Sequence, residues 1–252
     1  MREILRQFQN EKYRGICSDD SFIIKDLRTG KFYELDTSEF EKSNLSYTER
    51  KSKFNDIEIG IIALFFVVIY GFNIYISLKE KYYEGNGRFS NLTIMFLLYM
   101  IIFIFFHEMG HFLCLKICGI KECKFGVKIN YIFLSFYIRM NDIYLLTKNE
   151  KLFVHSGGLV VSVLLNAVTY LFGLITHNEI ICFLTQIMVW DIVMNTIPVF
   201  DSDGYKILLT LLNINERRQK DCNKNFIKFC KVINILIVVI YFVTWICSFI
   251  NK

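Results

Sequence analysis

The sequence predicts an all-α polytopic membrane protein with about five transmembrane helices, an interfacial β-ribbon and a small N-terminal cytoplasmic hairpin module. Hydrophobic residues make up 54% of the 252 residues, more than is usual in a soluble domain. Several apolar runs reach the roughly 20 residues that cross a hydrocarbon core about 30 Å thick. Lys and Arg gather between these runs, where they fix topology, so the net charge of +5 does not indicate nucleic-acid binding.

The first predicted domain, residues 1–56, is mixed polar and charged. It contains no apolar core followed by a cleavage site, so it does not have the pattern of a secretory signal peptide. Apolar and β-branched residues flank Arg28, Thr29 and Gly30. This pattern predicts a β-hairpin, because Gly30 can adopt a positive φ in the turn.

The second predicted domain, residues 57–252, is the membrane domain. Its five apolar segments cover roughly residues 57–78, 92–119, 153–175, 180–200 and 229–250. Between the second and third segments, the sequence alternates and is rich in Tyr, Phe and Ile. We expect a β-ribbon there, covered by protein at the membrane interface, because exposed strand backbone is not tolerated in lipid.

The distribution of Lys and Arg predicts how the chain is oriented. Regions 1–56, 120–151 and 204–231 carry 11, six and seven of these residues. The 79–91 loop carries three, the 176–179 turn none and the C-terminal tail one. With five spans, the three rich regions share one side. We therefore expect a multi-pass protein of the cell membrane with its N-terminus in the cytoplasm and its C-terminus outside.

The second apolar segment contains an H-E-x-x-H pattern formed by His107, Glu108 and His111. On a helix, two His residues four positions apart share one face and can bind the same zinc ion, while the Glu polarises a water molecule. Ionisable residues within a bilayer are costly and usually functional. The structural alternative is two His residues satisfied by neighbouring groups, which leaves Glu108 unpaired. One zinc ion per chain accounts for all three side chains.

A third zinc ligand is expected near the end of the fourth apolar segment. A catalytic zinc site usually has three protein ligands and leaves one position for water. Asp201 and Asp203 emerge at the same predicted depth as the two His residues, toward the cytoplasmic side. Pro198 ends the helix and Gly204 permits a tight turn, so an Asp in this region can reach the metal.

The two motifs together resemble those of the site-2 protease class of intramembrane zinc metalloproteases. HEMGH lies in one membrane segment, and N-x-x-P-x-x-x-x-D-G, starting at Asn195, lies in a later one. The extension DGYKILLTLLNI is more similar to the peptide zinc metalloproteases found near ribosomally made, modified peptides. The resemblance covers about residues 90–215, the expected metalloprotease core. It assigns the third ligand to Asp203 rather than Asp201.

The resemblance also implies that Asn195 contacts the substrate backbone or the developing oxyanion. An interhelical hydrogen bond is the structural alternative for this amide.

For several other residues in the apolar segments, the sequence favours a structural role over a role in catalysis. The small residues 156–158 open the third segment and favour close helix packing over direct substrate contact. His155 is expected to be hydrogen-bonded to its surroundings. Cys114 and Cys118 are expected to pack rather than bind zinc. Asp191 lies in the fourth segment, and either pairing with a polar group or a role in proton access would fit.

These observations predict an intramembrane zinc metalloprotease. His107, His111 and Asp203 hold zinc, and Glu108 takes a proton from the attacking water and delivers it to the leaving amine. The resemblance implies a small peptide precursor or a single-span membrane protein as substrate, and a peptide exporter or a peptide-modifying enzyme as partner. The main alternative is a catalytically silent, protease-like scaffold that assists peptide export or immunity. A metal or proton carrier fits less well, because the segments hold few other ionisable residues.

Overall fold

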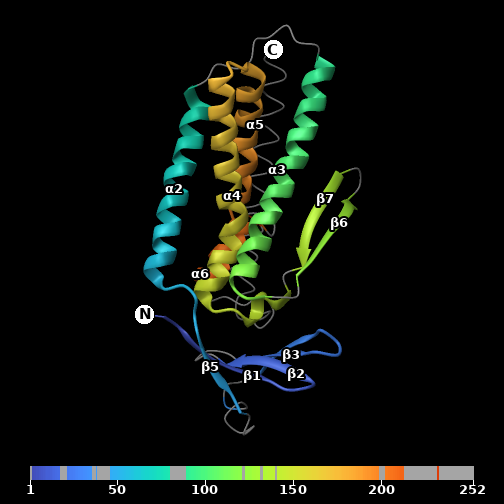
Figure 1. Ribbon diagram of the computed structural model, residues 1–252, viewed down its shortest axis with the longest axis vertical. Coiled ribbons are helices and arrows are strands. Elements are labelled where there is room, and N and C mark those ends of the chain that lie inside the picture. Colours follow the sequence, from blue (N-terminus) through green and yellow to red (C-terminus); the bar gives the residue numbers. More distant parts are fainter. Residues whose placement is uncertain are drawn as a thin grey trace.

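The computed structural model describes residues 2–17, 22–35, 38, 46–79, 89–120, 123–130, 133–139, 141–198, 202–212 and 232. In this part of the chain, a bundle of long helices stands above a small antiparallel sheet, with a β-ribbon beside the bundle (Figure 1). The predicted fifth apolar segment, 229–250, lies outside the described residues except for residue 232.

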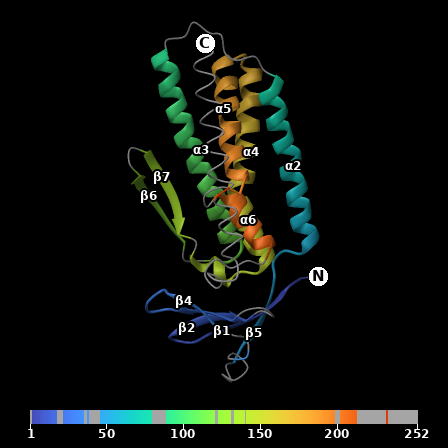
Figure 2. The ribbon, with the colours of Figure 1, turned by 180° about the vertical axis from the view of Figure 1, so that it is seen from behind.

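Four long helices form the bundle: α2 (Asp56–Lys79), α3 (Phe89–Ile117), α4 (Lys148–Ile175) and α5 (Glu179–Thr196). Each of them is long and apolar enough to cross a membrane. Helix α4 packs against each of the other three, and the short helix α6 (Asp203–Leu211) packs against α4 and α5 (Figure 2). The chain is therefore a mostly helical membrane protein.

Buried polar side chains join three of these helices. The Asn166 side-chain amide donates to Asn73 Oδ1 over 2.7 Å, and the Asn73 amide donates to the Val163 carbonyl over 3.1 Å. The Tyr99 hydroxyl donates to Asn166 Oδ1 over 3.2 Å. Hydrogen bonds of this kind hold membrane helices together where lipid supplies no hydrophobic driving force. They fix α2 and α3 against α4.

Helix α4 begins earlier than the apolar segment predicted. Thr147 and Glu150 form a capping box, in which each side chain accepts a hydrogen bond from the backbone N–H of the other residue. This motif satisfies N–H groups that lack partners at a helix start. It starts the helix at Lys148, so that α4 extends beyond its apolar stretch toward the N-terminal sheet.

The β-ribbon expected after the second segment is present. Strands β6 (Lys124–Asn130) and β7 (Phe133–Arg139) pair antiparallel. Strand β7 lies against α3, and the Phe125 ring meets the edge of the Phe105 ring of α3 with centroids 6.0 Å apart (Figure 1). The 3₁₀ helix η1 (Asn141–Leu145) connects the ribbon to α4.

The N-terminal region is a five-stranded antiparallel sheet. Its strands are β1 (Ile4–Gln9), β2 (Tyr13–Cys17), β3 (Phe22–Asp26), β4 (Phe32–Leu35) and β5 (Thr48–Lys51), in the order β4-β3-β2-β1-β5. The predicted hairpin corresponds to β3 and β4, and Gly30 between them has a φ of 69°. The other three strands were not predicted, because their short, charged sequences carry a weak alternating pattern.

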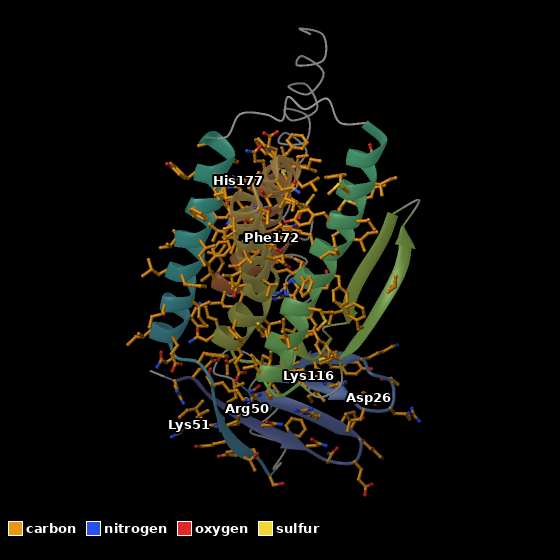
Figure 3. The ribbon with its side chains drawn as sticks, turned by 45° about the horizontal axis from the view of Figure 1, so that its top comes forward. Asp26, Arg50, Lys51, Lys116, Phe172 and His177 are labelled. Carbon is orange, nitrogen blue, oxygen red and sulfur yellow. The ribbon has the colours of Figure 1, made fainter. Side chains whose placement is uncertain are left out.

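The sheet is anchored to the bundle by an ion pair between the half-buried Arg50 and the fully buried Glu150. Arg50 lies on β5, in the N-terminal sheet (Figure 3). Its guanidinium donates to Glu150 Oε1 over 2.6 Å and to the Cys118 carbonyl over 3.1 Å. The Glu150 side chain has no exposed surface and also accepts from the Lys53 backbone N–H. A second ion pair joins Lys25 of β3 to Asp142 of η1 over 2.7 Å.

Apolar side chains complete this junction. Leu5, Ile16 and Ile23 of the sheet pack against Leu145 of η1. The sheet is thus fixed to the end of α3 and the start of α4. A division of the chain into separate domains at residue 56 stays a prediction.

Candidate metal centre

Helix α3 brings His107 and His111 together. The two residues lie one turn apart, as the H-E-x-x-H spacing predicts, and their Nε2 atoms are 3.4 Å apart. Both are in the half of α3 that leads toward the sheet. His111 is buried and His107 is half-buried. The rings meet edge to face, so that both Nε2 atoms face the same point.

The turn between α5 and α6 brings in Asp203. Helix α5 ends at Thr196, because a residue before proline disfavours helical backbone, and Ile197 before Pro198 is extended. Ser202 then caps α6: its hydroxyl accepts from the Tyr205 N–H. Asp203 is consequently the first residue of α6 and returns toward α3.

Gly204 is needed in this turn for a different reason from the predicted one, which was the conformational freedom of glycine. Its backbone does not have a positive φ, which among the described glycines occurs only at Gly30 and Gly119. Instead, a Cβ at Gly204 would overlap the Thr196 carbonyl oxygen. The glycine is needed because the start of α6 lies directly against the end of α5.

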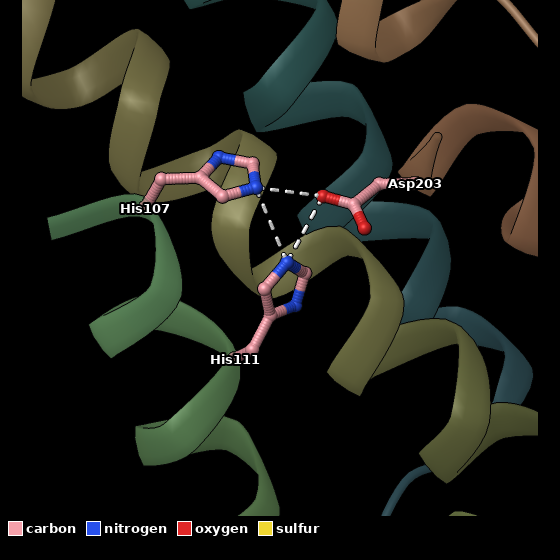
Figure 4. A group of neighbouring side chains, drawn as sticks. All are labelled: His107, His111 and Asp203. Atoms are coloured by element: carbon pink, nitrogen blue, oxygen red, sulfur yellow. Dashed lines mark hydrogen bonds and ion pairs between the residues drawn. The ribbon is translucent and has the colours of Figure 1, made fainter. Parts of the chain in front are cut away.

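Asp203 completes a group of three converging side chains (Figure 4). Its Oδ2 atom is 3.0 Å from His107 Nε2 and 2.9 Å from His111 Nε2. Burial raises the pKa of the Asp203 carboxyl, but the two neighbouring imidazoles outweigh burial and bring this pKa below its usual range. The carboxylate form is therefore the one that the site favours at neutral pH.

The outer nitrogen of each imidazole is held by α4. His111 Nδ1 lies 2.8 Å from the Val154 carbonyl oxygen, and His107 Nδ1 lies 2.9 Å from Ser162 Oγ. Because a carbonyl can only accept, His111 Nδ1 must carry a hydrogen, and the neutral ring then presents a lone pair at Nε2. Such outer contacts orient the His ligands of metal sites.

The donor set fits zinc. Two imidazole nitrogens and one carboxylate oxygen are common zinc ligands in catalytic sites, where the fourth position is open. Three acceptors facing one point also require a cation, either a proton or a metal ion. The geometry is thus compatible with a His-His-Asp zinc centre formed by His107, His111 and Asp203.

Gly158 of α4 makes room for both imidazoles. A Cβ at this position would overlap His111 Nε2 and would lie 2.8 Å from the Cε1 and Nε2 atoms of His107. Next to it, a Cβ at Gly157 would lie 2.9 Å from the Gly110 carbonyl oxygen of α3. The packing role expected of this small-residue stretch agrees with these contacts, and at Gly158 the neighbours that need the space are the two imidazoles.

Glu108 lies beside the three converging residues. It is half-buried, and its electrostatic neighbours are His111, His107, Asp203 and Lys206. No hydrogen bond or ion pair engages its carboxylate in the described part of the chain. This carboxylate is consequently available to accept a proton near the centre.

The structure also describes the surroundings of the other residues for which the sequence gave an expectation. The Asn195 side-chain amide donates to Asp191 Oδ2 over 3.1 Å, and both residues lie on α5. This hydrogen bond is therefore not the interhelical bond that was the structural alternative for Asn195. Cys114 and Cys118 pack in a buried apolar cluster, as expected. The expectation that His155 is hydrogen-bonded was wrong for the part of the chain that the structure describes, where its buried Nδ1 has no hydrogen-bond partner. Asp201 lies outside the described residues.

The contributions of Val154, Ser162 and Gly158 were not predicted from the sequence. A backbone carbonyl leaves no signal in a sequence. Ser162, however, is a polar residue within an apolar run and lies one helical turn after Gly158. This spacing could have pointed to a single polar face on α4.

The fold and the centre define a class of helical membrane protein with a buried His-His-carboxylate group suited to zinc. No family model matches the chain, and no solved structure matches it. Among curated proteins, it is 30% identical over 254 aligned positions to the "Putative peptide zinc metalloprotease protein YydH" of Bacillus subtilis (strain 168). The alignment covers 97% of this chain and 98% of that protein. The chain belongs to this family of peptide zinc metalloproteases.

Proposed function

We propose that the protein is a zinc-dependent endopeptidase of the site-2 protease type, which hydrolyses a peptide bond within or at the membrane. The observation that carries this proposal is the convergence of His107 Nε2, His111 Nε2 and Asp203 Oδ2, with Glu108 next to them. The family membership supports a metalloprotease role independently.

Each of these residues has a defined role in the proposed reaction. His107, His111 and Asp203 hold one zinc ion, which when bound would polarise a water molecule and the scissile carbonyl. Glu108 accepts a proton from the attacking water and passes it to the leaving amine. The hydrogen bonds from α4 keep both imidazoles in the orientation that the site needs.

The zinc content of the purified protein tests the proposed centre. We expect about one zinc per chain in the wild type, and a strong loss in Asp203→Ala, because two ligands bind zinc poorly where three are needed. Glu49→Ala, which removes an exposed carboxylate from strand β5 of the sheet, is the matched control and should keep its zinc. A folded wild type that stays without zinc after reconstitution would contradict the proposal.

Glu108→Gln separates an enzyme from a catalytically silent scaffold. This variant keeps the ligands, so we expect it to bind zinc like the wild type but to lose peptide hydrolysis by at least about 100-fold, the usual effect of removing a general base. A scaffold would show no hydrolysis in either protein, and the alternative role in export or immunity would then be preferred.

We further propose that the β-ribbon receives the substrate as an added strand. A helical substrate hides its carbonyls in hydrogen bonds and must be extended before attack, and strand addition to a sheet edge extends it. The ribbon lies along α3, the helix that carries His107 and Glu108.

Proline substitutions through residues 129–138 test this role. Because proline lacks the N–H that a paired strand donates, we expect slower cleavage with unchanged zinc content. Unchanged turnover across the series would reject strand addition.

The family and the membrane setting support a proposal for the substrate class. We propose a small peptide precursor or a single-span membrane protein, presented to a centre on the cytoplasmic side. The N-terminal sheet would then lie in the cytoplasm, where it could recognise the peptide or serve as a structural support.

A peptide exporter or a peptide-modifying enzyme is the proposed partner. Asn195 is proposed to contact the substrate next to the centre.

A further inference from the structure

Asp191 is an ionisable residue in an otherwise apolar helix. Helix α5 contains no Lys or Arg, and Asp191 lies in its final third with its side chain exposed. Carboxylates within membrane segments are costly when they face lipid, and they normally face a protein interior or a water-filled cavity. The position of Asp191 therefore calls for a polar or charged neighbour.

The described residues supply only one such partner. The Asn195 side-chain amide, one turn along α5, donates to Asp191 Oδ2 over 3.1 Å. A carboxylate can accept about four hydrogen bonds, so the described residues use only a small part of this capacity. No ion pair to Asp191 occurs within the described ranges. The neutral amide fixes the carboxylate in position but does not compensate its charge.

Asp191 also lies close to the metal centre. Its carboxylate interacts electrostatically with His107. It is about 7.5 Å along the helix axis from the end of α5 at Thr196, given a rise of about 1.5 Å per residue. The turn that follows carries Asp203. Asp191 is not among the three converging donors, and no Lys or Arg in the described part of the chain pairs with its carboxylate.

We propose that Asp191, held by Asn195, is a subsite for a cationic side chain of the peptide substrate, Lys or Arg, next to the scissile bond. The inference rests on the proposed function, because it names the chemistry of the substrate for the same centre. An arriving ammonium or guanidinium group supplies both the missing charge and the missing donors, through hydrogen bonds that are stronger than neutral ones.

Affinity selection tests this subsite without requiring turnover. Zinc-loaded Glu108→Gln protein in detergent is mixed with short synthetic peptides randomised at every position, and the retained peptides are sequenced by mass spectrometry. We expect Lys and Arg to be enriched roughly tenfold at one position, as a charge-assisted hydrogen bond would give. Adding Asp191→Asn should abolish this enrichment while the zinc content is unchanged.

Glu179→Gln in the same background is the matched control. It removes one negative charge from the exposed, opposite end of α5 and should leave the enrichment intact. The inference is overturned if no basic residue is enriched, or if the enrichment survives Asp191→Asn. Absence of cleavage by the wild type would instead contradict the proposed enzyme, and the selection would still decide the subsite.

Discussion

Gly158→Ala is expected to weaken zinc binding by about 10- to 100-fold, the range seen when the groups that orient metal ligands are changed. The added methyl group would occupy the space of His111 Nε2 and press on the His107 ring. Neither ring can withdraw easily, because α4 holds both outer nitrogens. Competition with a chelator of known affinity measures the change.

Gly71→Ala is the control for this substitution. Gly71 lies in α2, and a Cβ there would meet nothing within 4 Å. We expect unchanged zinc affinity and slightly greater stability, because alanine favours helix over glycine. If Gly158→Ala bound zinc as tightly as Gly71→Ala, the two imidazoles would not be the ligands, or α4 would not support them.

Arg50→Ala is expected to lower the free energy of unfolding by about 3–5 kcal/mol, the usual cost of removing one partner of a buried ion pair. The substitution leaves the fully buried Glu150 carboxylate without its guanidinium, and the Cys118 carbonyl loses a donor. Denaturant unfolding of the detergent-purified protein, followed by circular dichroism, measures this loss.

An exposed ion pair provides the comparison. Arg2 lies 3.4 Å from Glu58, and half of the Arg2 side chain is exposed. Arg2→Ala should cost less than about 1 kcal/mol, because such pairs contribute little in water. Equal losses in Arg50→Ala and Arg2→Ala would mean that the sheet is not held by the buried pair. Arg50→Ala combined with Glu150→Gln should recover part of the loss, because the amide oxygen can still accept from the backbone N–H groups at this site and no charge is then left buried alone.

Features encoded by local spacing could be predicted from the sequence. The spacing of four positions from His107 to His111 places both rings on one face of any helix, and the apolar segments predicted the four described spans. Gly30 marked its turn because few other residues adopt a positive φ. For Asp203, spacing alone left Asp201 as an equal candidate, and only the family resemblance chose between them.

Features that depend on tertiary contacts could not be predicted. Strand β5 pairs with β1 across more than 40 residues, and nothing in either short strand specifies the other. The start of α4 is different, because Thr147 and Glu150 have the local T-x-x-E spacing of a capping box. The general rule that buried polar atoms are hydrogen-bonded predicts a partner for His155, but its Nδ1 has none among the described residues.

The hydrogen bond from His111 to the Val154 carbonyl has a consequence for comparisons between distant relatives. Every amino acid supplies the same carbonyl, so another side chain that fits the buried cluster around residue 154 would leave the support of the imidazole unchanged. Gly158, one turn later, has no such freedom, because any side chain would enter the space of the rings. In a diverged relative, a glycine at this helical position would therefore indicate an intact centre more reliably than any polar residue around it.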